Sequence, residues 1–258
     1  AFSANALDDE AEMDIVPSAG GYFRTAPDSE AVADASRILA SASQPVMLVG
    51  DRLAQSGGSA EAVRIAEMLG AKVYSTCYSE MSFPTGHPQF MGRVNPVLPS
   101  FRKLVSSADA VLAVGTNVFS GYFFFSGRTL NPATKLVHID SAYREVGKSE
   151  PTDVGMIADP KIALGHLAEA LESDMSGSDR EAAKGRAATA AEEKAAQQAA
   201  WQGRVKNRWD IKPMSAERMM TEIAGALPAN TIIADDAITT GESLHGAMEF
   251  NEPGSIFG

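Results

Sequence analysis

Apolar and polar positions follow a regular order between residues 28 and 172. Apolar residues recur at helical spacing in four segments: 28–42, 63–70, 101–105 and 162–171. Short, mostly apolar runs lie between or after them, at 45–50, 72–75, 110–115, 135–140 and 154–157. Strands that are apolar on both faces and alternate with helices are typical of a parallel sheet covered by helices. Because crossovers between parallel strands are right-handed, we predict an α/β fold with a doubly wound, Rossmann-like sheet over residues 28–172.

The pattern changes after residue 172. Residues 173–212 are polar and then alanine-rich, with seven basic residues against three acidic ones over 180–208, and we predict a helical connector there. A second unit begins at residue 213, with a helix capped by Ser215, a strand over 231–234 and a helix over 242–248. Since two helices and one strand cannot bury a core alone, we expect 213–258 to be the start of a larger α/β domain.

The first residues have a different composition. Seven acidic residues stand against Arg24 alone over residues 1–30, together with Pro17, Gly20 and Gly21. Such a segment is typical of an exposed connection. We interpret residues 1–27 as a solvated linker rather than an interaction tail.

Composition narrows the classes of function. The chain has 258 residues, with 22 Lys+Arg against 33 Asp+Glu and a formal net charge of −11, which argues against a nucleic-acid binder. No apolar stretch approaches the ~18 residues that a membrane-spanning helix needs. The single cysteine, Cys77, cannot form an intramolecular disulfide or a multi-cysteine metal site, which indicates a reducing cytoplasm.

Few polar residues have a spacing that indicates catalysis. His138 falls within a predicted strand and His166 within a predicted helix, so we interpret both as packing or surface residues. His87 is a candidate, because its loop follows the carboxyl end of a strand, where doubly wound sheets bind ligands; packing is the alternative. Asp140 ends a strand where such folds contact a ribose, and a loop acid or a helix cap is the alternative. No basic residue closely flanks Cys77, which disfavours a nucleophile.

The loop over residues 235–241 is the more specific candidate. It joins a strand to a helix and carries two hydroxyls, Thr239 and Thr240. The first amides of a helix and its positive dipole end suit a phosphate group. N-capping of the helix by either threonine is the alternative, and the residues alone leave both open.

Four segments together resemble the thiamine-diphosphate-dependent 2-oxoacid decarboxylases and acetolactate synthases, with the benzoylformate decarboxylases as the nearest branch. The segments are FPTGHPQFMGRVNP, AVLAVGTNVFSGYFF, KLVHID and IIADDAITTGESLHGA, followed by PGSIFG. The resemblance covers most of residues 15–170 and 213–258. It implies that 28–172 is the central domain of a three-domain enzyme, that the linker over 1–27 follows a missing N-terminal domain, and that 213–258 begins the domain that binds the diphosphate. On this resemblance the chain is an internal fragment.

The resemblance also implies the cofactors, thiamine diphosphate and Mg²⁺. In this family the first domain supplies a glutamate that activates the cofactor, and a G-D-G…N stretch of the third domain holds Mg²⁺ and the diphosphate. Neither feature is present in these 258 residues. We therefore expect both cofactors to be held mainly by regions outside the chain, and the chain alone to be inactive.

Two sets of site residues follow from the resemblance. The family's diphosphate-contacting loop matches Ile238, Thr239 and Thr240. A catalytic histidine of the benzoylformate decarboxylases matches Tyr122, which can donate a hydrogen bond but is a poor proton shuttle near neutral pH; aromatic packing is its alternative. FAD is not expected, because the stretches 50–52 and 115–117 lack the glycine triplet and the arginine that hold FAD in acetolactate synthases.

The sequence thus predicts a lyase that decarboxylates a 2-oxoacid, or one that performs the related carboligation. The resemblance implies a small-molecule substrate and a homodimer or homotetramer, and neither nucleic acid nor a membrane is expected as a partner. Two alternatives remain, an acetolactate synthase-type carboligase and a non-catalytic Rossmann-like module that binds a nucleotide.

Overall fold

A computed structural model describes most of the chain. The described residues are 10, 12, 14, 16, 24–76, 80–95, 98–119, 127–228, 230–237 and 239–258. The predictions for Tyr122, Ile238 and Cys77 fall outside these residues.

A six-stranded parallel sheet forms the centre of the molecule. Its strands lie in the order β3-β2-β1-β4-β5-β6, and every neighbouring pair is parallel. The strands are β1 (Pro45–Val49), β2 (Lys72–Ser75), β3 (Phe90–Arg93), β4 (Ala110–Val114), β5 (Lys135–Asp140) and β6 (Val154–Ile157). This order is that of the doubly wound nucleotide-binding folds, so the predicted fold class is confirmed.

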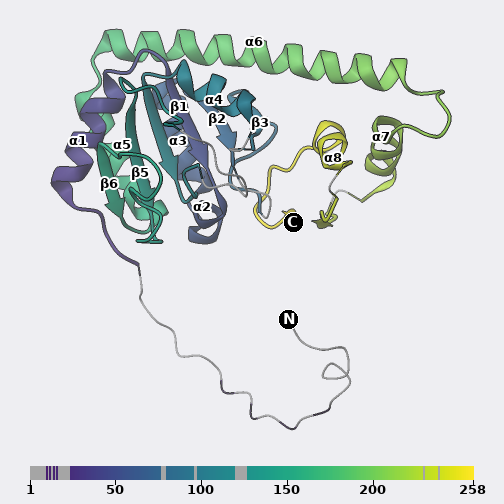
Figure 1. Ribbon diagram of the computed structural model, residues 1–258, viewed down its shortest axis with the longest axis horizontal. Coiled ribbons are helices and arrows are strands. Elements are labelled where there is room, and N and C mark those ends of the chain that lie inside the picture. The colour runs from purple at the N-terminus through teal and green to yellow at the C-terminus, as the bar shows by residue number, and fades with distance from the viewer. Residues whose placement is uncertain are drawn as a thin grey trace.

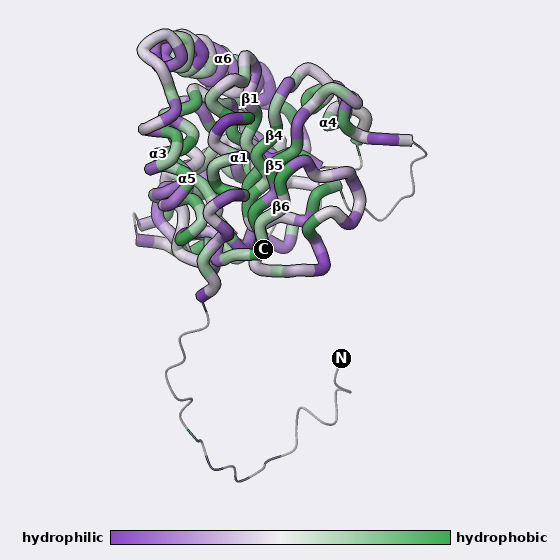
Figure 2. The backbone as a smooth tube through the Cα atoms, turned by 90° about the vertical axis from the view of Figure 1, so that its left-hand side faces the viewer, coloured by the Kyte–Doolittle hydropathy of each residue, from purple (hydrophilic) through white to green (hydrophobic). Residues whose placement is uncertain are grey.

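The two faces of the sheet are covered unequally. Helices α1 (Ser29–Ala40), α3 (Ser59–Leu69) and α5 (Pro160–Asp174) cover one face, and α4 (Pro99–Ser106) lies on the other (Figure 2). Alternate residues of β1 enter the two cores: Met47 and Val49 pack with α1, α3 and α5, whereas Val46 and Leu48 pack on the α4 side. Burial on both faces explains why the sequences of β1, β4 and β5 are mostly apolar.

The predicted strands of the sheet are all present, and two elements were missed. The run over 154–157 forms β6 at one edge. Strand β3 was missed because it reads Phe-Met-Gly-Arg and lies at the other edge, where only two of its residues are buried. Helix α2 (Asp51–Ser56) follows β1 directly and ends at Gly57, whose φ of 70° is left-handed. The glycine pair at 57–58 therefore separates two helices.

A long helix connects the sheet to the last part of the chain. Helix α6 (Gly177–Asn207) passes across the end of the sheet where β2 begins and continues towards α7 (Ala216–Ala226) and α8 (Gly241–Ala247) (Figure 1). Its first turn is fixed by reciprocal hydrogen bonds between Ser176 and Asp179. Gly70 lets α6 approach closely, because an added Cβ there would lie 2.1 Å from the carbonyl oxygen of Ala183.

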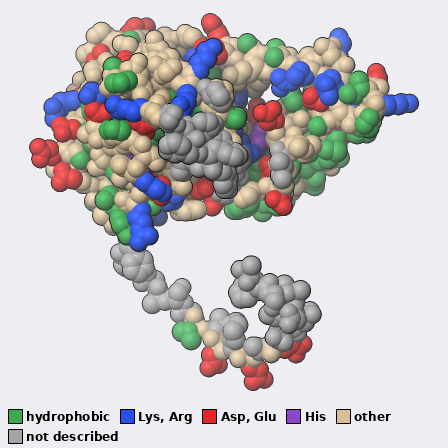
Figure 3. Space-filling view, in the orientation of Figure 1, with side chains coloured by type: hydrophobic (Ala, Val, Ile, Leu, Met, Phe, Trp, Pro, Cys, Tyr) green, Lys and Arg blue, Asp and Glu red, His purple; other side chains and the backbone are tan. Residues whose placement is uncertain are grey.

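The last unit shares a small core with the sheet domain. Strands β7 (Ile233–Ala234) and β8 (Ile256–Phe257) pair in parallel, and α8 lies between them in the chain. Both strands are shorter than a typical strand. The strand predicted over 231–234 is thus present only in its second half. Met81, Leu244, Phe250 and Ile256 form the core that joins this unit to the sheet domain. No residue of α7 is buried, and apolar side chains gather on this unit in Figure 3.

Candidate functional site at the carboxyl ends of the strands

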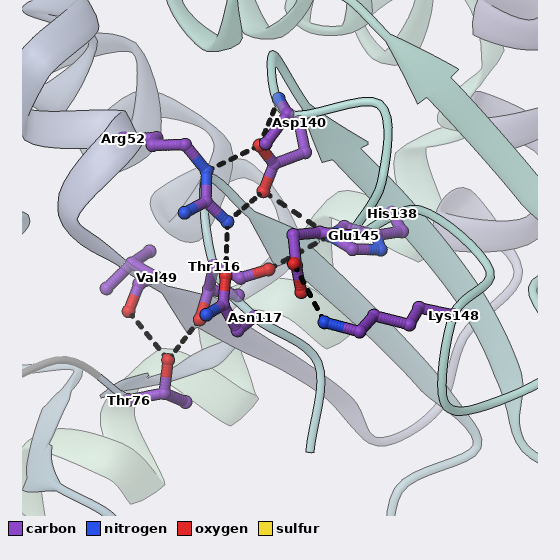
Figure 4. Close-up of polar contacts among 10 residues, drawn as sticks. Val49, Arg52, Thr76, Thr116, Asn117, His138, Asp140, Glu145 and Lys148 are labelled. Carbon is purple, nitrogen blue, oxygen red and sulfur yellow. Dashed lines mark hydrogen bonds and ion pairs between the residues drawn. The ribbon is translucent and has the colours of Figure 1, made fainter. Parts of the chain in front are cut away.

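The order of the strands reverses between β1 and β4. From β1 the chain proceeds through β2 to β3 on one side, and from β4 through β5 to β6 on the other. Doubly wound folds bind ligands in the crevice outside the carboxyl ends of the strands at such a point. Five polar side chains meet there, Arg52, Thr116, Asn117, His138 and Asp140 (Figure 4).

Arg52 spans this crevice. Its Nε donates to Asp140 Oδ1 at 2.6 Å and one terminal nitrogen donates to Asp140 Oδ2 at 2.8 Å, so the guanidinium and the carboxylate form a two-point pair. The same terminal nitrogen donates to Asn117 Oδ1 at 2.7 Å. Asp140 is fully buried, so it is not the exposed loop acid considered from the sequence.

The surroundings of Asp140 favour its charged form. Burial by itself raises the pKa of this carboxyl, but neighbouring His138, the hydrogen bonds from Arg52 and the Ala142 amide outweigh burial and lower the pKa. His138 is fully buried; its Nε2 lies 3.1 Å from the carbonyl oxygen of Thr116 and 3.6 Å from Asp140 Oδ2. His138 is thus a packing residue, as predicted.

The backbone closes the same crevice. An added Cβ at Gly50 would lie 2.5 Å from the carbonyl oxygen of Gly115, and one at Gly115 would lie 2.3 Å from the amide nitrogen of Leu53. The Arg52 amide donates to the Gly115 carbonyl at 3.1 Å. Chain segments that follow β1 and β4 are therefore in contact where other doubly wound folds place a pyrophosphate.

A second polar cluster lies where the last unit meets the sheet domain. Asp235 follows β7, His245 belongs to α8 and Arg93 ends β3. Asp235 Oδ2 lies 3.6 Å from a terminal nitrogen of Arg93 and 3.9 Å from His245 Nε2. Arg93 also contacts His245 Nε2 directly. Since arginine only donates, Nε2 accepts this hydrogen bond and carries no proton.

Burial and the charge of Arg93 favour the neutral form of His245. Burial is the main cause that lowers its pKa from 6.5 to about 4, and the charge of Arg93 acts in the same direction. Asp235 opposes this shift. The histidine is therefore an uncharged hydrogen-bond acceptor near neutral pH, and the cluster connects β3 to the loop over 235–241.

Thr239 and Thr240 lie in that loop, at the start of α8. Thr240 is the residue that caps α8, but its side chain makes no capping hydrogen bond. Ser243 and Leu244 instead donate to the backbone carbonyl of Thr240 at 3.0 and 3.1 Å. In the part of the chain that the structure describes, neither threonine hydroxyl has a protein partner, so both remain free to donate to an anion. Side-chain capping by Thr240, the alternative considered from the sequence, is wrong.

The other two histidines considered from the sequence, His87 and His166, lie outside both polar clusters. His87 Nδ1 accepts from the amide of Gln89 at 3.2 Å and its Nε2 lies 3.4 Å from Glu67, so it fixes a turn. His166 is exposed on α5. Among the described residues no group of three or more His, Cys, Asp or Glu side chains is arranged to hold a metal ion. Over the same residues, no helix has the length and apolarity needed to cross a membrane.

Sequence reasoning missed Arg52, Arg93 and His245. Arg52 and Asp140 are 88 positions apart, and Arg93 and His245 are 152 positions apart, so no local spacing indicates either contact. The one available signal was position: Arg52 and Arg93 stand at or just after the ends of parallel strands, where side chains converge.

Comparisons with known proteins agree with this fold. The family model described as "Thiamine pyrophosphate enzyme, central domain" matches residues 32–167. An acetolactate synthase from Mycobacterium avium is 28% identical over 156 residues, which are 58% of this chain and 24% of that protein. A sulfoacetaldehyde acetyltransferase from Alcaligenes xylosoxydans xylosoxydans is 28% identical over 243 residues, which are 86% of this chain and 40% of that protein.

A solved structure extends the likeness to the last unit. The benzoylformate decarboxylase from Polynucleobacter necessarius superposes with a TM-score of 0.74 at 15% identity, over 96% of this chain and 43% of that one. At this identity the superposition shows the fold alone. The chain spans less than half the length of each of these three proteins.

Proposed function

The chain belongs to the thiamine pyrophosphate enzymes through their central domain, and on this premise we propose that it is part of an enzyme that decarboxylates a 2-oxoacid. When bound, thiamine diphosphate supplies the electron sink for the loss of CO₂. Carboligation of the acetolactate synthase type is the second candidate, because relatives of both kinds of name match the chain.

The observation that carries this proposal is the pair of unpartnered hydroxyls at Thr239 and Thr240. We propose that this loop, including Ile238, contacts the diphosphate of the cofactor. Two hydroxyl donors and the first amides of α8 form a donor set that suits phosphate oxygens. Asp235 Oδ1 accepts a hydrogen bond from the amide of Ala237 at 3.0 Å, and Asp235 Oδ2 pairs with Arg93. These two contacts hold the start of the loop against β3.

The domain boundaries are part of the same proposal. Residues 28–172 would form the central domain, 173–212 the connector and 213–258 the start of the diphosphate-binding domain, after a linker over 1–27. The exposed apolar residues of the last unit, among them Ile223 and Ile232, support a larger domain there. Four points remain predictions from the sequence and the family resemblance. They are the binding of Mg²⁺, Tyr122 as an active-site residue, a homodimeric or homotetrameric assembly, and a cytoplasmic location.

We further propose that the sheet domain holds neither FAD nor another nucleotide at the β1–β4 crevice. This proposal is supported by Arg52, which pairs with Asp140 across the crevice, and by the backbone at Gly50 and Gly115, which leaves no room for a Cβ. This geometry also disfavours the alternative of a free-standing nucleotide-binding module.

Titration with thiamine diphosphate tests the proposal. The complete translation product of the reading frame that contains this chain should bind thiamine diphosphate in the presence of Mg²⁺ and decarboxylate at least one of a panel of 2-oxoacids. The 258-residue chain alone should do neither. Micromolar, Mg²⁺-dependent binding of thiamine diphosphate by the isolated chain would contradict the domain assignment.

Threonine variants test the loop itself. In the complete protein, Thr239→Val and Thr240→Val should each raise the dissociation constant of thiamine diphosphate about tenfold, since each removes a hydrogen bond to a charged oxygen. Thr221→Val is the matched control, because the Thr221 hydroxyl donates to the Glu217 carbonyl within α7. An unchanged constant in both loop variants would remove these hydroxyls from the cofactor site.

A further inference from the structure

An open groove crosses the α4 face of the sheet, at the opposite end from the crevice. It has a volume of about 990 Å³ and lies over the amino-terminal halves of β1 and β2, between α4 and α6. Its floor includes Val46 and Tyr74, α4 contributes Lys103 and Leu104, and α6 contributes Gly185 and Arg186.

The groove exists because one crossover has no helix over this face. The described part of the connection between β2 and β3, residue 76 and residues 80–89, contains no helix. On this side α4 packs its Phe101 and Val105 against β1 and β4, and α6 passes along the end of the sheet. The space between these two helices is left open above Tyr74.

The groove is lined by three cationic side chains, Lys72, Lys103 and Arg186, by one carboxylate, Asp179, and by the phenol of Tyr74. The Tyr74 hydroxyl has no hydrogen-bond partner in the described part of the chain, and burial raises its pKa to about 12, so it keeps its proton. Lys103 is exposed on α4 and forms no ion pair with any described residue. Lys72, by contrast, is paired with Glu193 at 2.6 Å.

The other charged side chains there are already engaged. Arg186 donates to the Leu69 carbonyl at 3.0 and 2.7 Å, and Asp179 accepts from Ser176 in the first turn of α6. Among the described charged residues that line the groove, Lys103 is therefore the one without an ion pair or a side-chain hydrogen bond, and the Tyr74 hydroxyl lines the same groove. The chain as a whole has a net charge of −11.

We propose that this groove binds an amphiphilic organic anion, with its carboxylate or sulfonate group at Lys103 and Tyr74 and its apolar body against Val46, Leu104 and Ala108. The volume lies at the upper end of the ~300–1,000 Å³ typical of small-molecule sites. The site is separate from the proposed diphosphate loop, which lies beyond the carboxyl ends of β2 and β3.

Two glycines of α6 provide a matched test. An added side chain at Gly185 or at Gly203 meets no atom within 4 Å of its Cβ, but only Gly185 lines the groove. The probe is 8-anilinonaphthalene-1-sulfonate, whose fluorescence rises in an apolar site, titrated into the 258-residue chain with decanoate as competitor. Gly185→Leu should abolish saturable 1:1 binding, and Gly203→Leu should leave it unchanged.

Lys103 tests the polar half of the site. Lys103→Gln should weaken binding of the probe about tenfold, because a charge-assisted hydrogen bond is lost, whereas Lys148→Gln, in an exposed pair with Glu145, should not. Thermal transitions matching that of the parent show that the variants are folded. The proposal is overturned if binding of the probe does not saturate, or if both glycine variants lose probe binding equally. It is also overturned if the chain is a dimer that Gly185→Leu dissociates and the probe does not bind.

Discussion

The guanidinium of Arg52 and the carboxylate of Asp140 form a two-point pair at the point where the strand order reverses, with Nε 2.6 Å from Oδ1. Asp140 is fully buried and Arg52 is one-quarter exposed. The pair joins the segment after β1 to the end of β5, near the point where other doubly wound folds bind ligands.

Asp140→Asn should destabilise the sheet domain. It removes one charge of a buried pair and leaves Arg52 uncompensated, which costs about 3 kcal/mol of unfolding free energy. Urea unfolding measures the change. The exposed pair of Lys184 and Glu181 gives the control, because Glu181→Gln should change the unfolding free energy by less than about 0.5 kcal/mol. Equal effects of the two substitutions would show that the buried pair does not stabilise the fold.

The pKa of Asp140 also predicts a dependence on acid pH. Its pKa is lowered in the folded chain, so its contribution is complete above the ordinary value of 3.8 and is lost as pH falls through the folded value. The unfolding free energy of Asp140→Asn should therefore converge with that of the parent chain at the lowest pH. A constant difference between the two at every pH would contradict this assignment.

His245 should make the contact of the last unit with the sheet domain sensitive to mild acid. Its pKa falls from 6.5 to about 4 on folding, so the unfolded state binds the extra proton first, and stability is lost as pH falls from 6.5 to 4. The loss amounts to about 3 kcal/mol at most. Hydrogen exchange of peptides from α7 and α8, measured between pH 6.5 and 4, reports this loss of stability as faster exchange.

Replacement of the histidine separates this effect from general acid denaturation. His245→Gln should flatten the dependence between pH 6.5 and 4. His166→Gln, exposed on α5, should leave it unchanged. If exchange in α8 rises with acid as steeply in His245→Gln as in the parent chain, the titrating group lies elsewhere.

Gly246 should be required for α8 to pack on α6. An added Cβ would lie 2.7 Å from the ring of Trp201, so Gly246→Ala should displace α8. Proteolysis within 213–258 should then become faster. Gly203→Ala is the control: it lies in α6 with open space and should stabilise the helix by up to about 1 kcal/mol. Unchanged cleavage in Gly246→Ala would mean that Trp201 moves aside at little cost.

The chain should not bind FAD. Titration of the 258-residue chain into a fixed concentration of FAD should leave the flavin fluorescence unchanged, because Arg52 lies across the β1–β4 crevice. A known flavin-binding protein serves as the positive reference. Saturable quenching that Gly50→Ala removes would place FAD at the β1–β4 crevice and refute the proposal.

The sequence by itself determined the fold class of this protein. The runs at β1, β4 and β5 are mostly apolar because these strands are buried on both faces, and that requirement is visible residue by residue. In β2 only alternate residues are buried, and its sequence is correspondingly mixed. Edge strand β3 lacks this signal, because only two of its residues are buried. It is a strand through its pairing with β2, which its own sequence does not indicate.

The polar sites were decided by the tertiary structure. The motif resemblance led to Thr239 and Thr240, but only the backbone at the start of α8 shows that their hydroxyls are not used for capping. Arg52 meets Asp140, and Arg93 meets His245, across more than eighty positions of sequence. Hydrophobic periodicity is a local property of the chain, whereas an ion pair or a groove depends on which strand ends and helices the topology brings together.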